Sequence, residues 1–174
     1  MDASTDASPA SNLAALLRAD LSANRGNSKG RVVVTLFRIA AIKRHDGGRQ
    51  RWNAPVRAIY RLVVEWVLGV ELPSSVVAGP GLRVWHGTGL VVHANVRLGA
   101  DVTLRHNTTL GAKGEGSDAL APVLGDRVDV GAGAIVLGAL EIGDDAVIGA
   151  GAVVVSDVPA GATVVGNPAR ILPR

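Results

Sequence analysis

The sequence of 174 residues predicts an all-β main domain, a parallel β-helix built from hexapeptide repeats, preceded by a small N-terminal α-helical segment. Aliphatic residues recur every six positions after Pro73, and the 22 glycines suit tight turns. Helical spacing of apolar residues is confined to the chain before Pro73. We expect a disordered lead over residues 1–11, helices over residues 12–70 and the β-helix over residues 71–174.

The N-terminal region carries three segments with helical signals. The first begins at a capping residue, Ser11 or Asn12, and ends near Asn24. The second runs from about Gly30 to Arg44 and is followed by a pair of glycines. The third begins near Pro55, since proline is favoured in the first turn of a helix. Its apolar positions are Ile59, Leu62, Val63, Trp66 and Val67.

The six-residue period defines the coils of the β-helix. Each hexad forms a short strand and a turn, and three hexads close one coil of a triangular prism. The leading aliphatic residue points into the prism, and stacked coils bury a continuous apolar column. A slip of two residues precedes Val92, and an extruded loop over residues 112–123 interrupts the period. The leading positions are Leu72, Ala78, Val84, Leu90, Val92, Leu98, Leu104, Leu110, Leu124, Val130, Val136, Ile142, Ile148 and Val154.

Composition narrows the function classes. The absence of cysteine excludes disulfides and thiolate metal sites. No signal peptide or membrane-spanning apolar run is evident, so we expect a cytoplasmic protein. Basic residues concentrate in residues 18–61, either as a solvated helix surface or as a surface for anionic lipid or a phosphorylated carrier. Arg38, Lys43 and Arg44 beside Val32–Ile42 suggest peripheral membrane contact. No nucleic-acid motif accompanies the charge, so nucleic acid is not an expected partner.

Two of the four histidines fall at related positions of the repeat. His86 and His106 are each the third residue of a hexad, where the side chain points away from the core. They are separated by one coil and the two-residue slip, so we expect them on one face of neighbouring coils, roughly 5 Å apart. The structural alternative is that both cap the polar edges of turns.

Several motifs resemble one enzyme family. The segments that match are His86–Val92, Val102–Gly111, Val130–Ala134 and Val165–Arg170. With them the chain resembles the hexapeptide-repeat acyltransferases, and in particular serine acetyltransferases and colanic-acid-type exopolysaccharide acetyltransferases. The resemblance implies a left-handed β-helix, acetyl-CoA as co-substrate and a homotrimer with active sites at the subunit interfaces. It implies no metal.

The resemblance also implies roles for individual residues. His86 would be the general base, because an imidazole can take the proton of an attacking alcohol. Glu71, fifteen residues earlier, stands where serine acetyltransferases have an aspartate that orients the histidine. Backbone N–H groups of Gly111 and Ala112 would stabilise the oxyanion. The coenzyme would run along small residues of two coils, with its phosphates near two cations. These cofactor candidates are Lys113, Gly131, Ala132, Gly133, Ala134, Gly149, Ala150 and Arg170.

The chain departs from serine acetyltransferases at the acceptor site. Leu120-Ala121-Pro122 replaces the Arg-His-Pro that holds serine in that family, and Trp85 replaces the aspartate before the catalytic histidine. Trp85 offers a flat apolar face either for a sugar ring or for packing at a subunit interface. We expect a sugar in polysaccharide biosynthesis, free or lipid-linked, as acceptor. Arg105 and His106 are further substrate candidates.

Three alternatives remain open from the sequence. The acceptor could be serine, or the chain could be a non-catalytic β-helix scaffold. A zinc enzyme of the γ-carbonic-anhydrase type needs three histidines, but the spacing of His86, His93 and His106 does not match that type.

Overall fold

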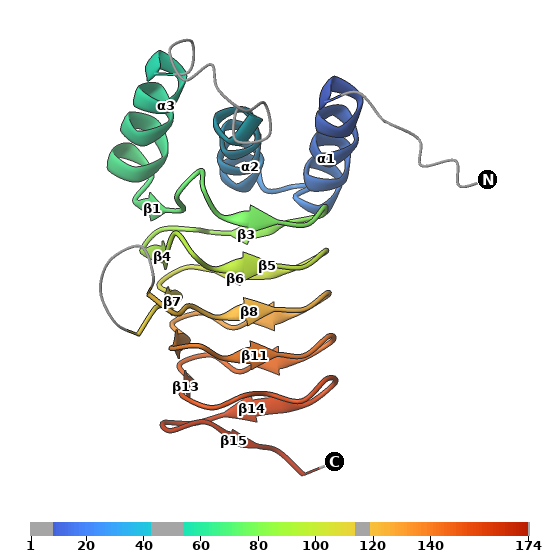
Figure 1. The fold of residues 1–174 in the computed structure, drawn as a ribbon, viewed down its shortest axis with the longest axis vertical. Helices are drawn as coiled ribbons and strands as arrows, with labels where there is room; N and C mark the ends of the chain where they lie inside the picture. Colours follow the sequence, from blue (N-terminus) through green and yellow to red (C-terminus); the bar gives the residue numbers. More distant parts are fainter. Residues whose placement is uncertain (1–8, 43–53, 114–118, 174) are drawn as a thin grey trace, which may run out of the picture.

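The computed structural model describes residues 9–173 except 43–53 and 114–118, and it shows a parallel β-helix with helices packed against its first coil (Figure 1). The predicted fold class is confirmed. The C-terminus lies at the opposite end of the solenoid from the helices (Figure 1). The disordered lead was expected to extend to residue 11, but α1 begins at Pro9, ahead of the predicted cap. Residues 1–8 lie outside the described chain.

The helical end has a small apolar core of its own. Asn27 caps α2, with its side-chain oxygen accepting a hydrogen bond of 2.9 Å from the Gly30 N–H. Phe37 of α2 and Tyr60 and Val64 of the third helix are buried. The third helix changes from α to π geometry after Tyr60, and most of the apolar residues that predicted it face solvent. The helices are α1 (Pro9–Ala23), α2 (Ser28–Ala41), α3 (Ala54–Tyr60) and the π-helix η3 (Arg61–Val67).

The strands form three faces of the prism, and all pairings are parallel except that of the last two strands. Face A holds β1 (Val70–Glu71), β4 (Leu90–Val92), β7 (Thr109–Gly111), β10 (Ile135–Leu137) and β13 (Val153–Val154). Face B holds β2 (Val77–Ala78), β5 (Arg97–Leu98), β8 (Val123–Leu124) and β11 (Glu141–Ile142). Face C holds β3 (Arg83–Trp85), β6 (Thr103–Arg105), β9 (Asp129–Val130), β12 (Val147–Ile148), β14 (Thr163–Val165) and β15 (Arg170–Ile171).

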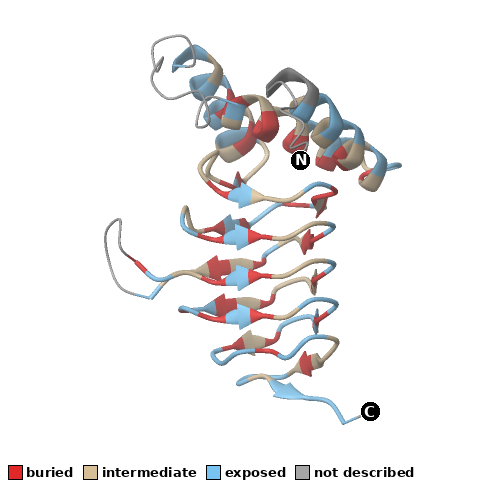
Figure 2. Ribbon diagram, turned by 45° about the vertical axis from the view of Figure 1, so that its right-hand side comes forward, coloured by how far each residue is buried: buried red, intermediate tan, exposed pale blue. Residues whose placement is uncertain are grey.

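The leading aliphatic residues form the core of the prism. Every leading position is buried except Ala78, which is half-buried. Figure 2 shows buried and exposed positions alternating along the coils, as expected when each short strand points one side chain inward. The apolar column therefore supplies most of the burial that holds the solenoid together.

The two-residue slip is a local bulge at the corner between faces C and A. The Thr88 carbonyl accepts a hydrogen bond from Asn107 N, just as the His106 carbonyl does from Gly133 N in the next coil. Thr88 and His106 therefore occupy equivalent corner positions, and His86 and Gly87 are the inserted residues. The expectation that His86 and His106 are equivalent positions is wrong for this reason. A bulge re-aims the side chain it carries, and here it turns His86 outward.

Side chains of the α1–α2 turn cap the open edge of the first strand of face C. The Asn24 amide donates to the Leu82 carbonyl at 2.8 Å and its oxygen accepts from Val84 N at 3.1 Å. The Asn27 amide donates to the Val84 carbonyl at 2.7 Å. These amides take the place of a neighbouring strand, so the backbone groups at the end of the solenoid stay paired.

A buried ion pair completes this edge. The Asp20 carboxylate accepts from the Gly81 and Leu82 N–H groups at 2.8 and 3.0 Å, and from Arg38 Nε at 2.7 Å. Arg38 also donates to the carbonyl of Ala78 at 2.7 Å. The suggestion that Arg38 belongs to a membrane-facing basic surface is therefore wrong, because its side chain is 6% exposed. Lys43 and Arg44 lie outside the described residues.

Candidate active site

The histidine pair occupies the corner between faces C and A. His86 is exposed and adopts a left-handed backbone conformation with φ 63°. His106 is half-buried, and the two ring centroids are 5.9 Å apart at an interplanar angle of 74°. The Trp85 ring lies 6.2 Å from the His86 ring. A left-handed conformation at a residue other than glycine is uncommon and clusters at functional sites.

The ring of His106 has an unsatisfied nitrogen. Its Nδ1 atom is buried and has no hydrogen-bond partner among the described residues. Burying such an atom unpaired is costly, so a bound ligand that supplies a partner would gain free energy there. The corner thus combines an exposed imidazole, a second imidazole with spare hydrogen-bonding capacity and an aromatic face.

Lys29 is a residue at this corner that sequence reasoning missed. It lies in the first turn of α2, and its Nζ donates a hydrogen bond to Thr88 Oγ1 in the loop that follows His86. The Thr88 hydroxyl in turn lies 3.4 Å from the His86 carbonyl. No periodicity could have signalled this contact, because it joins residues 59 positions apart through the docking of the helices.

Small residues continue the histidine corner along the solenoid. Gly133 N donates to the His106 carbonyl at 3.0 Å, and Gly151 N donates to the Ala132 carbonyl at 2.9 Å. The predicted coenzyme residues 131–134 and 149–150 therefore lie on the same edge of the prism as the histidines. Coil packing also demands these glycines: a Cβ on Gly131 would come 2.5 Å from Ala150 N. Gly133 requires glycine for another reason, a φ of 68°.

The comparisons with known proteins agree with this architecture. The chain is 33% identical over 156 residues to WcaB of Escherichia coli strain K12, named as a colanic acid biosynthesis acetyltransferase. The matched region covers 87% of this chain and 96% of WcaB. It is 42% identical over 128 residues to serine acetyltransferase of Helicobacter pylori strain ATCC 700392 / 26695, 74% of each protein. No model of a known protein family matches it.

This chain belongs to the hexapeptide-repeat acyltransferases.

Solved structures support the membership. The soybean serine acetyltransferase apoenzyme superposes with a TM-score of 0.81 at 33% identity, covering 92% of this acyltransferase and 69% of the soybean chain. Neisseria gonorrhoeae serine acetyltransferase in complex with serine gives a TM-score of 0.80 at 32% identity, over 93% and 69% of the two chains. The acyltransferase therefore has the left-handed β-helix of this family, an exception to the right-handed rule for parallel crossovers. It is an acetyltransferase.

The structure does not pair the predicted carboxylate with the histidine. Glu71 is exposed on face A of the acyltransferase, in register with Val91, whereas His86 lies in the corner loop. Among the hydrogen bonds and ion pairs of the described residues there is none between Glu71 and His86.

Arg105 is occupied by the coil itself. Its guanidinium forms an ion pair with Asp129 and donates to the Val130 carbonyl at 3.1 Å. Hydrogen bonding to Asp129 raises the pKa of Arg105 above its ordinary value. Arg105 was predicted to contact substrate. In the structure its guanidinium is instead engaged in bridging neighbouring coils of face C.

The predicted oxyanion donors lie at another corner. Gly111 ends β7 of face A, and Ala112 and Lys113 follow it towards face B. Asn107 beside His106 and Gly111 are separated by the length of a short strand, roughly 13 Å. Within one chain of the acyltransferase these donors and the histidines therefore do not converge. The extruded loop starts here, closed by an antiparallel bridge between Lys113 and Leu120.

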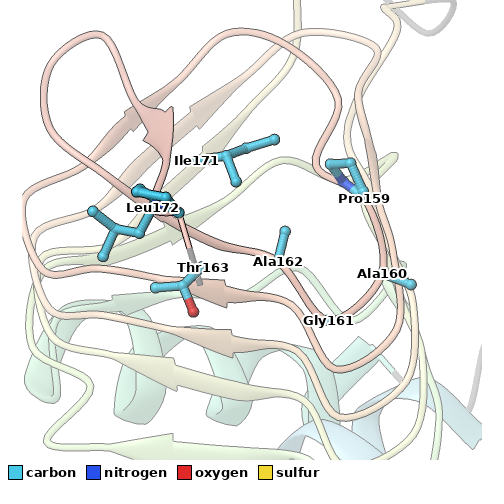
Figure 3. A pocket seen from close by; sticks show the side chains of 8 residues that line it. Pro159, Ala160, Gly161, Ala162, Thr163, Ile171 and Leu172 are labelled. Carbon is cyan, nitrogen blue, oxygen red and sulfur yellow. The ribbon is translucent and has the colours of Figure 1, made fainter.

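Other candidate positions lie away from the histidines. Arg170 is exposed near the C-terminus, where a pocket of about 620 Å³ is lined by Pro159–Thr163 and Ile171–Pro173 (Figure 3). This pocket is at the opposite end of the acyltransferase from the helices and is mostly apolar. His93 follows β4 and stands at the corner between faces A and B. The described residues contain no group of three histidine, aspartate or glutamate side chains placed to hold a metal ion.

Proposed function

We propose that this chain is an acetyl-CoA-dependent O-acetyltransferase that acts on a sugar hydroxyl in polysaccharide biosynthesis, with His86 as general base. The observation that carries the proposal is the exposed His86 imidazole beside His106 and Trp85, at the head of a corner lined by small residues. The exposed ring can meet an incoming alcohol, and the small residues let a thin pantetheine arm approach the backbone.

In the proposed reaction His86 removes the proton of the acceptor hydroxyl as its oxygen attacks the thioester carbonyl. The tetrahedral intermediate then collapses, the C–S bond breaks, and the departing thiolate takes the proton from the imidazolium. The products are the acetyl ester and free coenzyme A. Such a base contributes roughly 10²–10⁴-fold to the rate. Glu71 would orient His86 only after a shift on substrate binding, since catalytic hydrogen bonds often tighten in the substrate complex.

The site is open on a single chain. His86 is exposed, and the pocket at the C-terminal end does not include it. A reaction that must exclude water therefore needs a wall from elsewhere. We propose that a second copy of the chain in a homotrimer supplies this wall, together with the oxyanion donors Gly111 and Ala112, and that Lys113 and Arg170 serve the coenzyme phosphates.

A sugar acceptor is supported by two observations. The similarity spans 96% of WcaB, a protein named for colanic acid biosynthesis. In addition, the extruded loop carries Leu120, Ala121 and Pro122, which offer no charge to bind an amino-acid zwitterion. If the sugar is lipid-linked, the enzyme would work in peripheral contact with a cytoplasmic membrane surface.

Serine O-acetyltransferase is the second candidate. It is favoured by the 42% identity to the Helicobacter pylori serine acetyltransferase and by the structural match to the serine complex from Neisseria gonorrhoeae. Lys29 supplies a cation at the corner that a carboxylate could use. The two candidates share the base, the donor and the reaction and differ in the acceptor.

An acetyl-CoA consumption assay tests the proposal. The acceptor panel contains serine, free monosaccharides, nucleotide sugars and lipid-linked sugars, and each acceptor is assayed with wild-type enzyme and with His86→Ala. We expect turnover with a sugar acceptor and a loss of roughly 10²–10⁴-fold in His86→Ala. Turnover with serine alone would establish the second candidate. Unchanged turnover in His86→Ala would exclude His86 as base, and no turnover with any acceptor of the panel would overturn both candidate acceptors.

A further inference from the structure

The third helix exposes an apolar face that the fold does not use. Tyr60 and Val64 pack against the solenoid, whereas the opposite side of the helix carries large apolar side chains in solvent. We call this surface the α3 face, and its members are Ile59 (55% exposed), Leu62 (60%), Trp66 (79%) and Val67 (71%). Such a clustered apolar surface costs solubility and marks an interaction site.

Two arginines border the α3 face. Arg57 and Arg61 are exposed, and with Tyr60, Glu65 and Ser74 they line a polar pocket of about 270 Å³ between the helix and the chain after β1. Glu65 lies 3.5 Å from Arg61 and is the acidic group on this helix, while the pKa of Tyr60 is raised by burial, so its hydroxyl stays neutral. The pocket therefore joins a cationic rim directly to an apolar face.

The charge of the described residues is divided along the solenoid axis. Residues 12–42 and 54–70 hold seven lysine and arginine residues and two acidic residues, a net charge of +5. Residues 71–113 and 119–173 hold six basic and eight acidic residues, a net charge of −2. The described helices all lie at one end of the solenoid (Figure 1), so this end of the molecule is the basic end. Its field attracts an anionic surface.

We propose that the α3 face docks the enzyme on an anionic phospholipid bilayer. Its apolar side chains would enter the headgroup boundary, and Arg57 and Arg61 would contact the lipid phosphates. An apolar face with tryptophan, bordered by arginines, is the pattern of helices that lie in a membrane interface. A second copy docked through the same end would bring two net charges of +5 together on the described residues, which opposes that arrangement.

This inference assigns a surface to the peripheral contact in the proposed function, and its test does not depend on acetyl transfer. The full chain is floated with vesicles of phosphatidylcholine alone and with vesicles that also contain phosphatidylglycerol. We expect binding to the anionic vesicles only, weakening as salt is raised. No flotation with anionic vesicles would overturn the proposal, even if the enzyme acetylates a sugar.

Matched variants locate the surface. Leu62→Ser/Trp66→Ser should weaken vesicle binding by about tenfold or more, because the apolar contribution is lost. Arg57→Gln/Arg61→Gln should weaken it by about fivefold per arginine. The controls are Val77→Ser and Arg97→Gln, exposed positions on face B, which should bind as wild type does.

Solution mass decides between the bilayer and a protein neighbour. We expect Leu62→Ser/Trp66→Ser to keep the wild-type mass and circular dichroism, since both side chains are exposed. A smaller assembly in this variant would identify the α3 face as a subunit contact and overturn the proposal. Equal flotation of wild type and this variant would overturn it as well.

Discussion

The imidazole rings of His86 and His106 lie 5.9 Å apart although the two residues are one full coil and a bulge apart in the chain. His86 sits on inserted residues and is exposed, whereas His106 belongs to the regular corner and is half-buried. This difference suggests a division of labour: the exposed ring can exchange protons with an acceptor, and the recessed ring offers a fixed hydrogen-bonding group.

We therefore predict that His106→Ala acts mainly on acceptor binding. Because the buried Nδ1 of His106 has no partner in the described chain, a bound acceptor would lose a hydrogen bond in the variant. We expect the KM for the acceptor to rise about tenfold, with a smaller change in kcat. Steady-state kinetics with varied acceptor checks this. A loss of kcat as large as that of His86→Ala, at unchanged KM, would contradict it.

Alanine should destabilise the fold at two glycines of the histidine corner, Gly131 and Gly133, for different physical reasons. A Cβ at position 131 meets backbone atoms of the next coil at 2.5–2.8 Å, which cannot move away cheaply. We expect Gly131→Ala to lower the free energy of unfolding by about 1–3 kcal/mol through overpacking. Urea unfolding measures this.

Gly133→Ala is the matched variant. Its Cβ would have open space, the nearest atom being Gly151 N at 4.0 Å, but φ is 68°. We expect a cost of about 1–2 kcal/mol from the left-handed backbone alone. If Gly131→Ala proves as stable as wild type, the close approach of the two coils is not as described.

Removing Asp20 should be among the most damaging single changes. Its carboxylate pairs with Arg38 and accepts from two backbone N–H groups of the first coil, entirely out of solvent. Asp20→Ala leaves the Arg38 cation buried without its partner, so we expect a loss of about 3–5 kcal/mol of stability. Chemical denaturation measures it. The double variant Asp20→Ala/Arg38→Met should recover part of the loss, and recovery of none would contradict the account.

Tyr60 should make the fold sensitive to alkali. Burial raises the pKa of its phenol well above the ordinary value, because ionised tyrosine would lose solvation, and its hydroxyl donates to the Leu72 carbonyl. A raised pKa in the folded state means that this contribution to stability is complete below pH 10 and is lost as pH rises further.

The check is the melting temperature between neutral pH and pH above 10 for wild type and Tyr60→Phe. We expect wild type to lose more stability than Tyr60→Phe over that interval, while at neutral pH the variant is weaker by about 1 kcal/mol for one hydrogen bond. An equal loss of stability above pH 10 in both proteins would show that ionisation of Tyr60 is not its cause.

Much of the solenoid could be predicted because its constraint is local and repeated. Leu104 and Leu110, or Val130 and Val136, each occupy the same position of a hexad, and each points inward in the structure. Glycine at positions such as 131 is likewise required by the close stacking of the next coil, which the 18-residue repeat brings to the same place each time. The pattern also predicted that His86 and His106 would be neighbours, although it treated as equivalent two positions that the bulge makes different.

The contacts that no pattern signals are those made by side chains across the fold. Asn24 and Asn27 look like residues that end a helix, yet they pair with the edge of β3. Arg38 looks like a solvated cation and is buried against Asp20. The apolar residues of the third helix read as an ordinary helical stripe, but Trp66 is exposed while Tyr60 and Val64 are covered.

The sequence by itself determined the prism, its core and the proximity of the two histidines on neighbouring coils, because period six repeats the same local geometry in every coil. Only the tertiary structure decided how the helices close the open end, which cations are buried, that Lys29 reaches the histidine loop and that no hydrogen bond or ion pair of the described residues joins Glu71 to His86. Those outcomes depend on rigid-body docking and on a two-residue bulge, where small shifts in orientation change which atoms meet.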